Sequence, residues 1–226
     1  MKYDIFVSGG GSAKENFNVD QLFFDSLLGK RLLYLPIGLK RSFVGYDGCI
    51  DWFRSVLRLH QKSDISLSVW INLNKKSEKI SRDNFDGIYI GGASDTFELH
   101  KNLLKHNIYQ EIMDFSKNKG IVYGGSGGGT VLGCSINYDQ FEKKLPPVKS
   151  ESANLCFGYS FFTHLNDINK PLIENGSFGP VIGLPEGSGF CVNYNTREGL
   201  FLGTKSGVIS NFDKQKYLSD HQSINL

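Results

Sequence analysis

Residues 119–133 read KGIVYGGSGGGTVLG, and within them five glycines and one serine (124–129) separate two apolar runs. The first run is typical of a buried strand and the second of a helix. Glycine inside a helical turn costs roughly 1 kcal/mol relative to alanine. Three consecutive glycines at the start of a helix therefore need a structural reason. The stretch predicts a strand that turns sharply into a helix.

The rest of the first half of the chain shows the same alternation. Short apolar runs, many of them ended by glycine or proline, alternate with segments of helical periodicity, which is the pattern of βαβ units. We expect strands at 3–11, 30–38, 65–72, 85–93 and 119–125, and helices at 18–28, 45–61 and 95–117, the last with a break near His106. The sequence predicts an α/β fold with a mostly parallel sheet flanked by helices.

Three of the predicted strands end in glycine-rich turns, at 9–11, 91–92 and 124–129. Right-handed crossovers place the carboxyl ends of parallel strands along one edge of the sheet. We therefore expect these three turns on the same side of the molecule, where functional loops of such sheets collect.

The pattern changes in the C-terminal part. Residues 140–152, QFEKKLPPVKSES, are charged and contain two prolines, which predicts an exposed loop. Beyond it, 179–194, 198–204 and 207–213 read as short strands joined by glycine turns, which would extend the sheet or form a small β subdomain. A chain of 226 residues favours one domain, 1–226.

The composition restricts the partners. With 25 Lys and Arg against 23 Asp and Glu, the chain is too balanced for nucleic acid or an anionic membrane as its main partner. It has no apolar run of the length of a membrane span, and its start reads as a strand, so we expect a cytoplasmic protein. Its cysteines lack zinc-ligand spacing and are expected to be reduced packing residues: Cys49, Cys134, Cys156 and Cys191.

Ser126 is the first candidate for catalysis. Gly124–Gly128 satisfy G-x-S-x-G between a predicted strand and a predicted helix, the context of a nucleophile elbow. Neighbours without side chains would let the two elements approach, and the helix start would offer free N–H groups to an oxyanion. The alternative is a turn that binds an anion, with Ser126 as a helix cap.

A hydroxyl nucleophile needs a base and a group that orients the base. Among the histidines, His164 follows a strand-like aromatic run and opens a polar loop, whereas His60, His100, His106 and His221 lie on predicted helices or in the polar tail. Glu186 lies in a glycine turn after Pro185 and is one candidate for the orienting carboxylate. Asp139 and Asp167 are competing candidates.

Five segments together resemble the peptidase E family, the aspartyl dipeptidases to which cyanophycinase is related. They are FVSGGGSAKENFNVDQLFF (6–24), YIGGASDTFEL (89–99), YGGSGGGTVLG (123–133), FFTHLND (161–167) and IGLPEGSGF (182–190). They follow one another in the family's order, and the resemblance spans residues 3 to about 203. Five motifs in sequence are much more specific than any one of them.

The resemblance implies a flavodoxin-like fold, similar to class I glutamine amidotransferases, with extra short C-terminal strands. It implies a triad of Ser126, His164 and Glu186, with oxyanion donors at the backbone N–H groups of Gly127 and Gly92. The implied activity is that of a serine dipeptidase, which hydrolyses peptides with an N-terminal aspartate through an acyl-enzyme on Ser126. No metal or organic cofactor is implied, and the partners are a small peptide substrate and at most a second copy of the chain.

Three residues depart from the family's pattern. Gly127 and Gly129 stand where alanine is usual, and the turn at 91–97 is longer, with Asp95 in place of asparagine. A carboxylate near an oxyanion would repel the developing charge or alter substrate choice. A degenerate or altered-specificity hydrolase is therefore one alternative, and a phosphate-binding module is another. Lys40, Arg41 and Arg197 are candidate cations for a substrate carboxylate.

Overall fold

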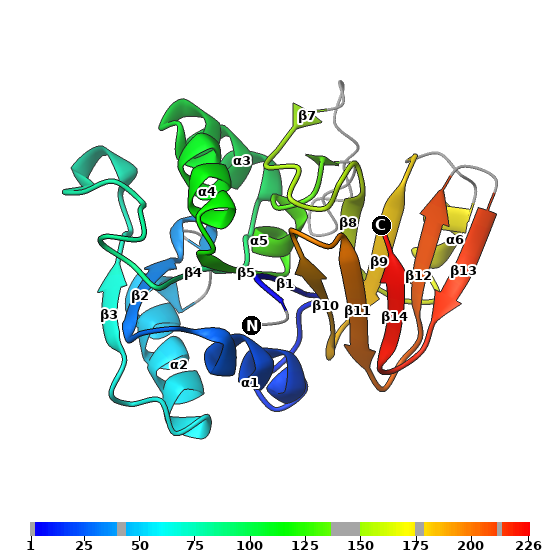
Figure 1. The fold of residues 1–226 in the computed structure, drawn as a ribbon, viewed down its shortest axis with the longest axis horizontal. Coiled ribbons are helices and arrows are strands. Elements are labelled where there is room, and N and C mark those ends of the chain that lie inside the picture. Colours follow the sequence, from blue (N-terminus) through cyan, green and yellow to red (C-terminus); the bar gives the residue numbers. More distant parts are fainter. Residues whose placement is uncertain (1–2, 40–43, 137–149, 175–178, 212–213) are drawn as a thin grey trace.

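A computed structural model describes residues 3–39, 44–136, 150–174, 179–211 and 214–226. Its centre is an eight-stranded sheet with helices on both faces, and a smaller four-stranded sheet lies beside it (Figure 1). The predicted α/β class with a mostly parallel sheet is confirmed.

The parallel part of the large sheet has the predicted strands. They are β1 (Ile5–Ser8), β2 (Arg31–Leu35), β3 (Ser66–Val69), β4 (Gly87–Ile90) and β5 (Ile121–Gly125). Their order is β3-β2-β4-β5-β1, and all four neighbouring pairs are parallel. This is the flavodoxin-like order 2-1-3-4-5, with the first strand of this chain in the place of the fifth.

The helices lie close to their predicted positions. They are α1 (Phe17–Ser26), α2 (Gly45–Leu59), α3 (Thr96–Lys105), α4 (Ile108–Lys117), α5 (Gly127–Thr130) and α6 (Lys170–Glu174), with 3₁₀ turns at Ile37–Leu39 and Leu73–Lys75. The predicted break near His106 separates α3 from α4, because Asn107 adopts a left-handed conformation with φ of 57°. No helix in the described part of the chain is long and apolar enough to cross a membrane.

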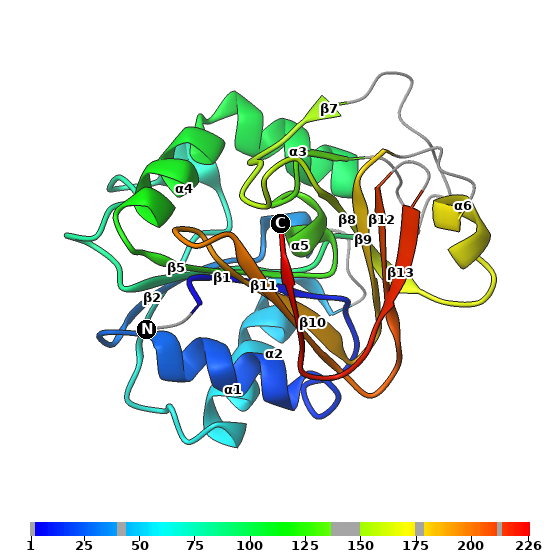
Figure 2. The same cartoon turned by 45° about the vertical axis from the view of Figure 1, so that its right-hand side comes forward.

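Each face of the large sheet has its own core. Strand side chains alternate between the two faces, so Phe6, Tyr89 and Tyr123 pack against α1 and α2. Their neighbours Val7 and Ile90 pack with residues of α3 and α4 on the other face. Figure 2 shows the two helix layers on opposite sides of the sheet.

The C-terminal strands extend the fold as predicted, but they divide between two sheets. The strands β10 (Ser188–Asn193), β11 (Glu198–Gly203) and β14 (Gln222–Asn225) continue the large sheet from β1 in antiparallel pairs. The second sheet has the order β13-β12-β9-β8 and comprises β8 (Ser160–Leu165), β9 (Val181–Pro185), β12 (Gly207–Asn211) and β13 (Lys214–Leu218).

Two expectations need correction here. The segment 179–194 forms two strands in different sheets, because the chain turns at Glu186 and at Gly187, whose φ is 74°. The predicted loop 140–152 lies outside the described residues up to 149, and its end forms β7 (Ser150–Glu151), which pairs with β6 (Ser135–Ile136). The polar tail also forms a strand, β14, since β11 offers it a free edge.

Candidate active site

The three glycine turns meet at the carboxyl ends of β1, β4 and β5, as expected. The Ser126 N–H donates to the Ser8 carbonyl at 3.0 Å. A Cβ atom added to Gly92 would lie 3.5 Å from the Ser126 Cβ, so the turn after β4 lies against the serine. The fold therefore places Ser126 at the centre of this edge of the sheet.

The glycines around Ser126 allow a tight strand-to-helix turn. Ser126 has φ of 53° and ψ of −122°, a conformation that residues other than glycine rarely adopt. A Cβ on Gly124 would lie 2.4 Å from the Gly128 carbonyl oxygen, and one on Gly128 would lie 2.4 Å from the Ile90 oxygen. Side chains at either position would prevent α5 from packing on β5 and β4, which explains the glycine run.

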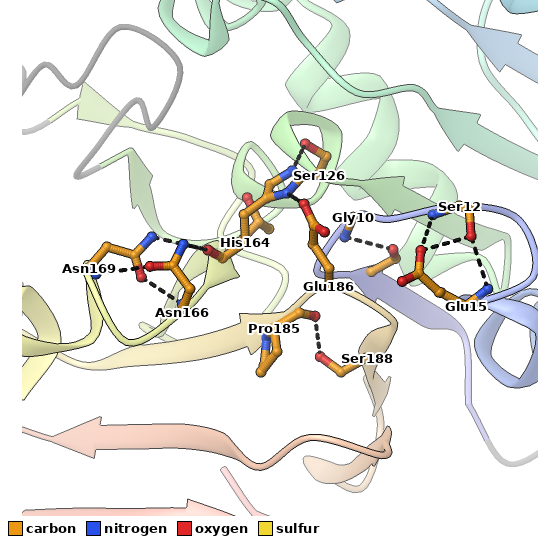
Figure 3. A network of polar contacts seen from close by, with 12 residues as sticks. Gly10, Ser12, Glu15, Ser126, His164, Asn166, Asn169, Pro185, Glu186 and Ser188 are labelled. Atoms are coloured by element: carbon orange, nitrogen blue, oxygen red, sulfur yellow. Dashed lines mark hydrogen bonds and ion pairs between the residues drawn. The ribbon is translucent and has the colours of Figure 1, made fainter.

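Ser126, His164 and Glu186 form a hydrogen-bonded series (Figure 3). The Ser126 Oγ lies 2.6 Å from His164 Nε2, and His164 Nδ1 lies 2.7 Å from Glu186 Oε1. The His164 side chain is mostly buried and that of Glu186 is half exposed. The structure thus brings together the three residues that the sequence singled out.

The end of β1 holds the three segments in place. Three consecutive carbonyl groups each accept one backbone N–H group: Ser8 from Ser126 at 3.0 Å, Gly9 from His164 at 2.9 Å and Gly10 from Gly187 at 2.9 Å. The donors belong to the elbow, to β8 and to the turn that carries Glu186. The sequence marked 9–11 only as a glycine turn, since these contacts join residues far apart in the chain.

His164 is fixed by its own backbone as well. Its φ of 53° interrupts the pairing of β8 with β9 between Thr163 and Leu165. Its carbonyl accepts hydrogen bonds from the Asn166 and Asn169 side-chain amides at 3.1 and 3.0 Å. The local bulge turns the imidazole away from the strand pattern and toward Ser126.

The other histidines and carboxylates have other surroundings. His60 forms a hydrogen bond with the Gln21 side chain and stacks on Phe17. His100 forms a hydrogen bond with the Tyr109 hydroxyl. Burial lowers the pKa of both imidazoles. His106 follows α3, and His221 is exposed. Asp167 is exposed in the turn after β8, whereas the imidazole of His164 bonds Glu186. Asp139 lies outside the described residues.

The departures at 95, 127 and 129 have packing explanations. The Asp95 carboxylate caps α3 by accepting the Glu98 N–H at 2.8 Å, so it is held at the helix start. A Cβ on Gly127 would lie 2.8 Å from the Ala93 Cβ, and one on Gly129 would lie 2.6 Å from Val7 Cγ1. Neighbouring side chains occupy the space that alanines would need.

A cavity of about 440 Å³ opens beside Ser126. Its lining comprises Ser8, Gly10, Gly11, Asn16, Leu39, Val44, Gly48, Cys49, Trp52, Tyr89, Gly92, Ala93, Gly125, Ser126 and His164. The wall that α2 contributes was not predicted from the sequence. The available signal was Trp52, a large aromatic residue outside the helical stripe of Phe53, Val56 and Leu57.

The candidate cations do not complete this site. Arg197 lies in the turn after β10. Because β10 runs antiparallel to β1, this turn lies at the end of the sheet opposite to Ser126. The Arg197 guanidinium there lies 4.9 Å from the Phe157 ring centroid. Arg197 is therefore too remote to bind a substrate at Ser126. Lys40 and Arg41 lie outside the described residues, and the residues that are described hold no cluster suited to a metal ion.

Comparisons with known proteins place the chain. Two solved structures share its fold. A peptidase from an acI-B1 Actinobacterium superposes with a TM-score of 0.74 and 15% sequence identity, over 100% of this chain and 98% of that chain. A putative peptidase E protein from Listeria monocytogenes EGD-e superposes with a TM-score of 0.59 and 18% identity, over 97% of this chain and 100% of that chain. No curated protein matches the sequence. The family model for peptidase family S51 matches residues 5–194, and since this is most of the chain, the protein belongs to that family.

Proposed function

We propose that the protein is a serine peptidase that cleaves small peptides through an acyl-enzyme on Ser126. The observation that carries this proposal is the series Ser126–His164–Glu186, with hydrogen-bond distances of 2.6 and 2.7 Å, at a strained strand-to-helix turn. A nucleophile, a base within hydrogen-bond reach and a group that orients the base are the parts that acyl transfer requires. Membership of a peptidase family supports the same reaction.

The first chemical step uses His164 as the base. As Ser126 Oγ attacks the peptide carbonyl carbon, Nε2 takes the hydroxyl proton, and the Nδ1–H group donates to Glu186. Glu186 fixes the tautomer with the free electron pair on Nε2 and balances the charge of the imidazolium. The leaving amine then takes the proton from Nε2, and water resolves the acyl-enzyme with the same base.

The oxyanion would be held by the backbone N–H groups of Gly127 and Gly92. Gly127 directly follows the nucleophile, and Gly92 lies against Ser126 from the neighbouring strand end. Donors fixed in place before the reaction stabilise the developing charge without reorganisation. The N-cap role of Asp95 supports this assignment, because its carboxylate is bound at the start of α3.

Dipeptides with an N-terminal aspartate are the substrate class that the resemblance to peptidase E implies. A cavity of about 440 Å³ is of the size that holds one or two residues, which supports small peptides. An aspartate preference rests on the resemblance alone, with Lys40 and Arg41 as its candidate cations, and it is an alternative to the apolar side chain that the described cavity lining favours.

The test is hydrolysis of a dipeptide panel by the wild type, Ser126→Ala and Ser223→Ala. Ser223 is an exposed serine of β14, so its variant controls for the substitution itself. We expect turnover by the wild type and by Ser223→Ala, and none by folded Ser126→Ala. Undiminished hydrolysis by Ser126→Ala would exclude the serine mechanism. Inactivity of the folded wild type on every peptide would favour the degenerate hydrolase, and tight binding of phosphate or nucleotide would favour the binding module.

A further inference from the structure

One wall of the cavity beside Ser126 is built from apolar side chains. Leu39 lies in the 3₁₀ turn after β2, Val44 precedes α2, and Trp52 lies near the middle of α2. Ala93 contributes its methyl group from the turn after β4. These residues come from separate segments, and the fold brings them to the same opening as the nucleophile.

This wall is not part of the protein core. Trp52 is 39% exposed and Val44 is 59% exposed, whereas Phe53 and Val56 on the same helix are fully buried against the sheet. A ligand with an apolar group in the cavity would cover this surface of Trp52 and remove it from water, which is favourable. The position of Trp52 thus indicates a ligand group that is itself apolar.

The polar groups of the cavity are already engaged with one another. Ser8 Oγ donates to Asn16 Oδ1 at 2.9 Å and accepts the Gly10 N–H at 3.1 Å. The Asn16 amide donates to the Ser12 carbonyl at 3.2 Å. The described lining residues include no Lys, Arg, Asp or Glu. These described residues offer a substrate carboxylate no opposite charge, whereas Lys40 and Arg41, which lie in the sequence between the lining residues Leu39 and Val44, are outside the described residues.

We propose that this cavity binds an apolar, preferably aromatic, side chain of the residue whose carbonyl Ser126 attacks. This proposal rests on the proposed function and names its substrate class. The cavity is assigned to the acyl side because its lining includes Ser126, Gly125 and Gly92. Only the acyl group stays bonded to Ser126 after the amine leaves, so a side chain seated there contributes to both chemical steps.

The test uses aminoacyl 7-amino-4-methylcoumarin amides, which vary the acyl side chain and keep one leaving group. For the wild type we expect kcat/KM for the phenylalanyl and leucyl amides to exceed that for the alanyl and aspartyl amides by roughly 10- to 100-fold. Trp52→Ala should lower the phenylalanyl value roughly tenfold and change the alanyl value little. Leu59→Ala, on the same helix and 40% exposed, is the matched control and should leave all four values unchanged.

A second variant tests whether the lack of a cation in the described cavity lining disfavours an aspartyl side chain. Trp52→Arg adds a cation to the wall, so the ratio of aspartyl to phenylalanyl hydrolysis should rise. If the wild type prefers the aspartyl amide and Trp52→Ala leaves that preference unchanged, the apolar assignment is wrong while the serine peptidase function stands.

Binding separates the two proposals if no amide is hydrolysed. Phenylalanine amide and aspartic acid amide would be titrated into Ser126→Ala by calorimetry, with and without Trp52→Ala. Binding of phenylalanine amide that depends on Trp52 would support the apolar cavity even where the peptidase function fails. Equal or tighter binding of aspartic acid amide would overturn it.

Discussion

At Gly10 the backbone passes directly beside the imidazole of His164. A Cβ on Gly10 would lie 2.3 Å from His164 Cε1 and 2.6 Å from Nε2, the atom that bonds Ser126. Gly10 also has φ of 96°, which disfavours any side chain. The glycine is therefore required for the position of the base as well as for the turn.

We predict that Gly10→Ala displaces the His164 ring and lowers kcat/KM by roughly 100-fold or more. Peptide hydrolysis by the folded variant measures this. Gly158→Ala is the matched control, because Gly158 has a similar φ of 92° but open space where the Cβ would lie. It should lose stability from backbone strain and keep its activity. Equal activities of the two variants would show that the approach of Gly10 to His164 is unimportant.

Gly127 and Ala93 form a complementary pair beside the nucleophile. Gly127→Ala would bring two methyl carbons to 2.8 Å and crowd the Ala93 N at 3.1 Å. We predict a marked loss of kcat/KM for Gly127→Ala, and partial recovery when Ala93→Gly is added. A double-mutant cycle measures the coupling, and additive effects of the two changes would contradict it.

The residues of the series were accessible from the sequence because each has a local signal. Ser126 and Glu186 lie in glycine turns after strands, and His164 follows an aromatic strand. For the cavity wall the signal was weaker: Trp52 stands outside the buried stripe of its helix, but its neighbours are set only when α2 packs beside the turn after β4. The contact of Gly10 with His164 was equally hidden, because the two residues are 154 positions apart in the chain and meet only in the tertiary structure.

At the scale of elements, α3 begins at the turn that lies against Ser126. Asp95 caps this helix through the Glu98 N–H at 2.8 Å. We predict that Asp95→Ala lowers the free energy of unfolding by about 1 kcal/mol, whereas Asp95→Asn leaves it nearly unchanged, because asparagine is an equally good N-cap. Chemical denaturation measures both variants. Equal destabilisation by the two changes would mean that the carboxylate acts through its charge.

The βα units could be predicted from the sequence because the strands are short apolar runs, most of them with a glycine or proline at the end. The C-terminal strands could be predicted only in part. The register Glu198↔Asn225 joins β11 to a polar tail, and β14 exists because that edge is available. Likewise, the division of β9 and β10 between two sheets depends on which neighbours each strand meets, which the pattern of 179–194 does not contain.

At the scale of the whole molecule, one buried carboxyl group links stability to pH. Asp20 of α1 is 1% exposed, and burial raises its pKa from 3.8 to about 7, an effect that the adjacent Tyr123 hydroxyl partly offsets. Between these two pH values the folded state binds more protons than the unfolded state. The contribution of Asp20 to the free energy of unfolding therefore falls as pH rises from about 4 to about 7.

We predict that Asp20→Asn removes this fall and stabilises the protein at pH 8 by up to about 4 kcal/mol, since each pKa unit corresponds to about 1.4 kcal/mol. Thermal and denaturant unfolding between pH 4 and 8 would measure it. Asp25→Asn is the control on the same helix, because hydrogen bonds from Gln21 and Lys62 lower the pKa of Asp25. A difference in stability between the wild type and Asp20→Asn that stays constant over this pH range would contradict the role of Asp20.

The most direct test of the peptidase mechanism is covalent labelling of the folded protein by a fluorophosphonate, read by intact mass and peptide mapping. The mechanism predicts one adduct, on Ser126, that is absent from Ser126→Ala and forms far more slowly in His164→Ala. A folded wild type that takes up no label, or an adduct that persists in Ser126→Ala, would contradict an activated serine at this site.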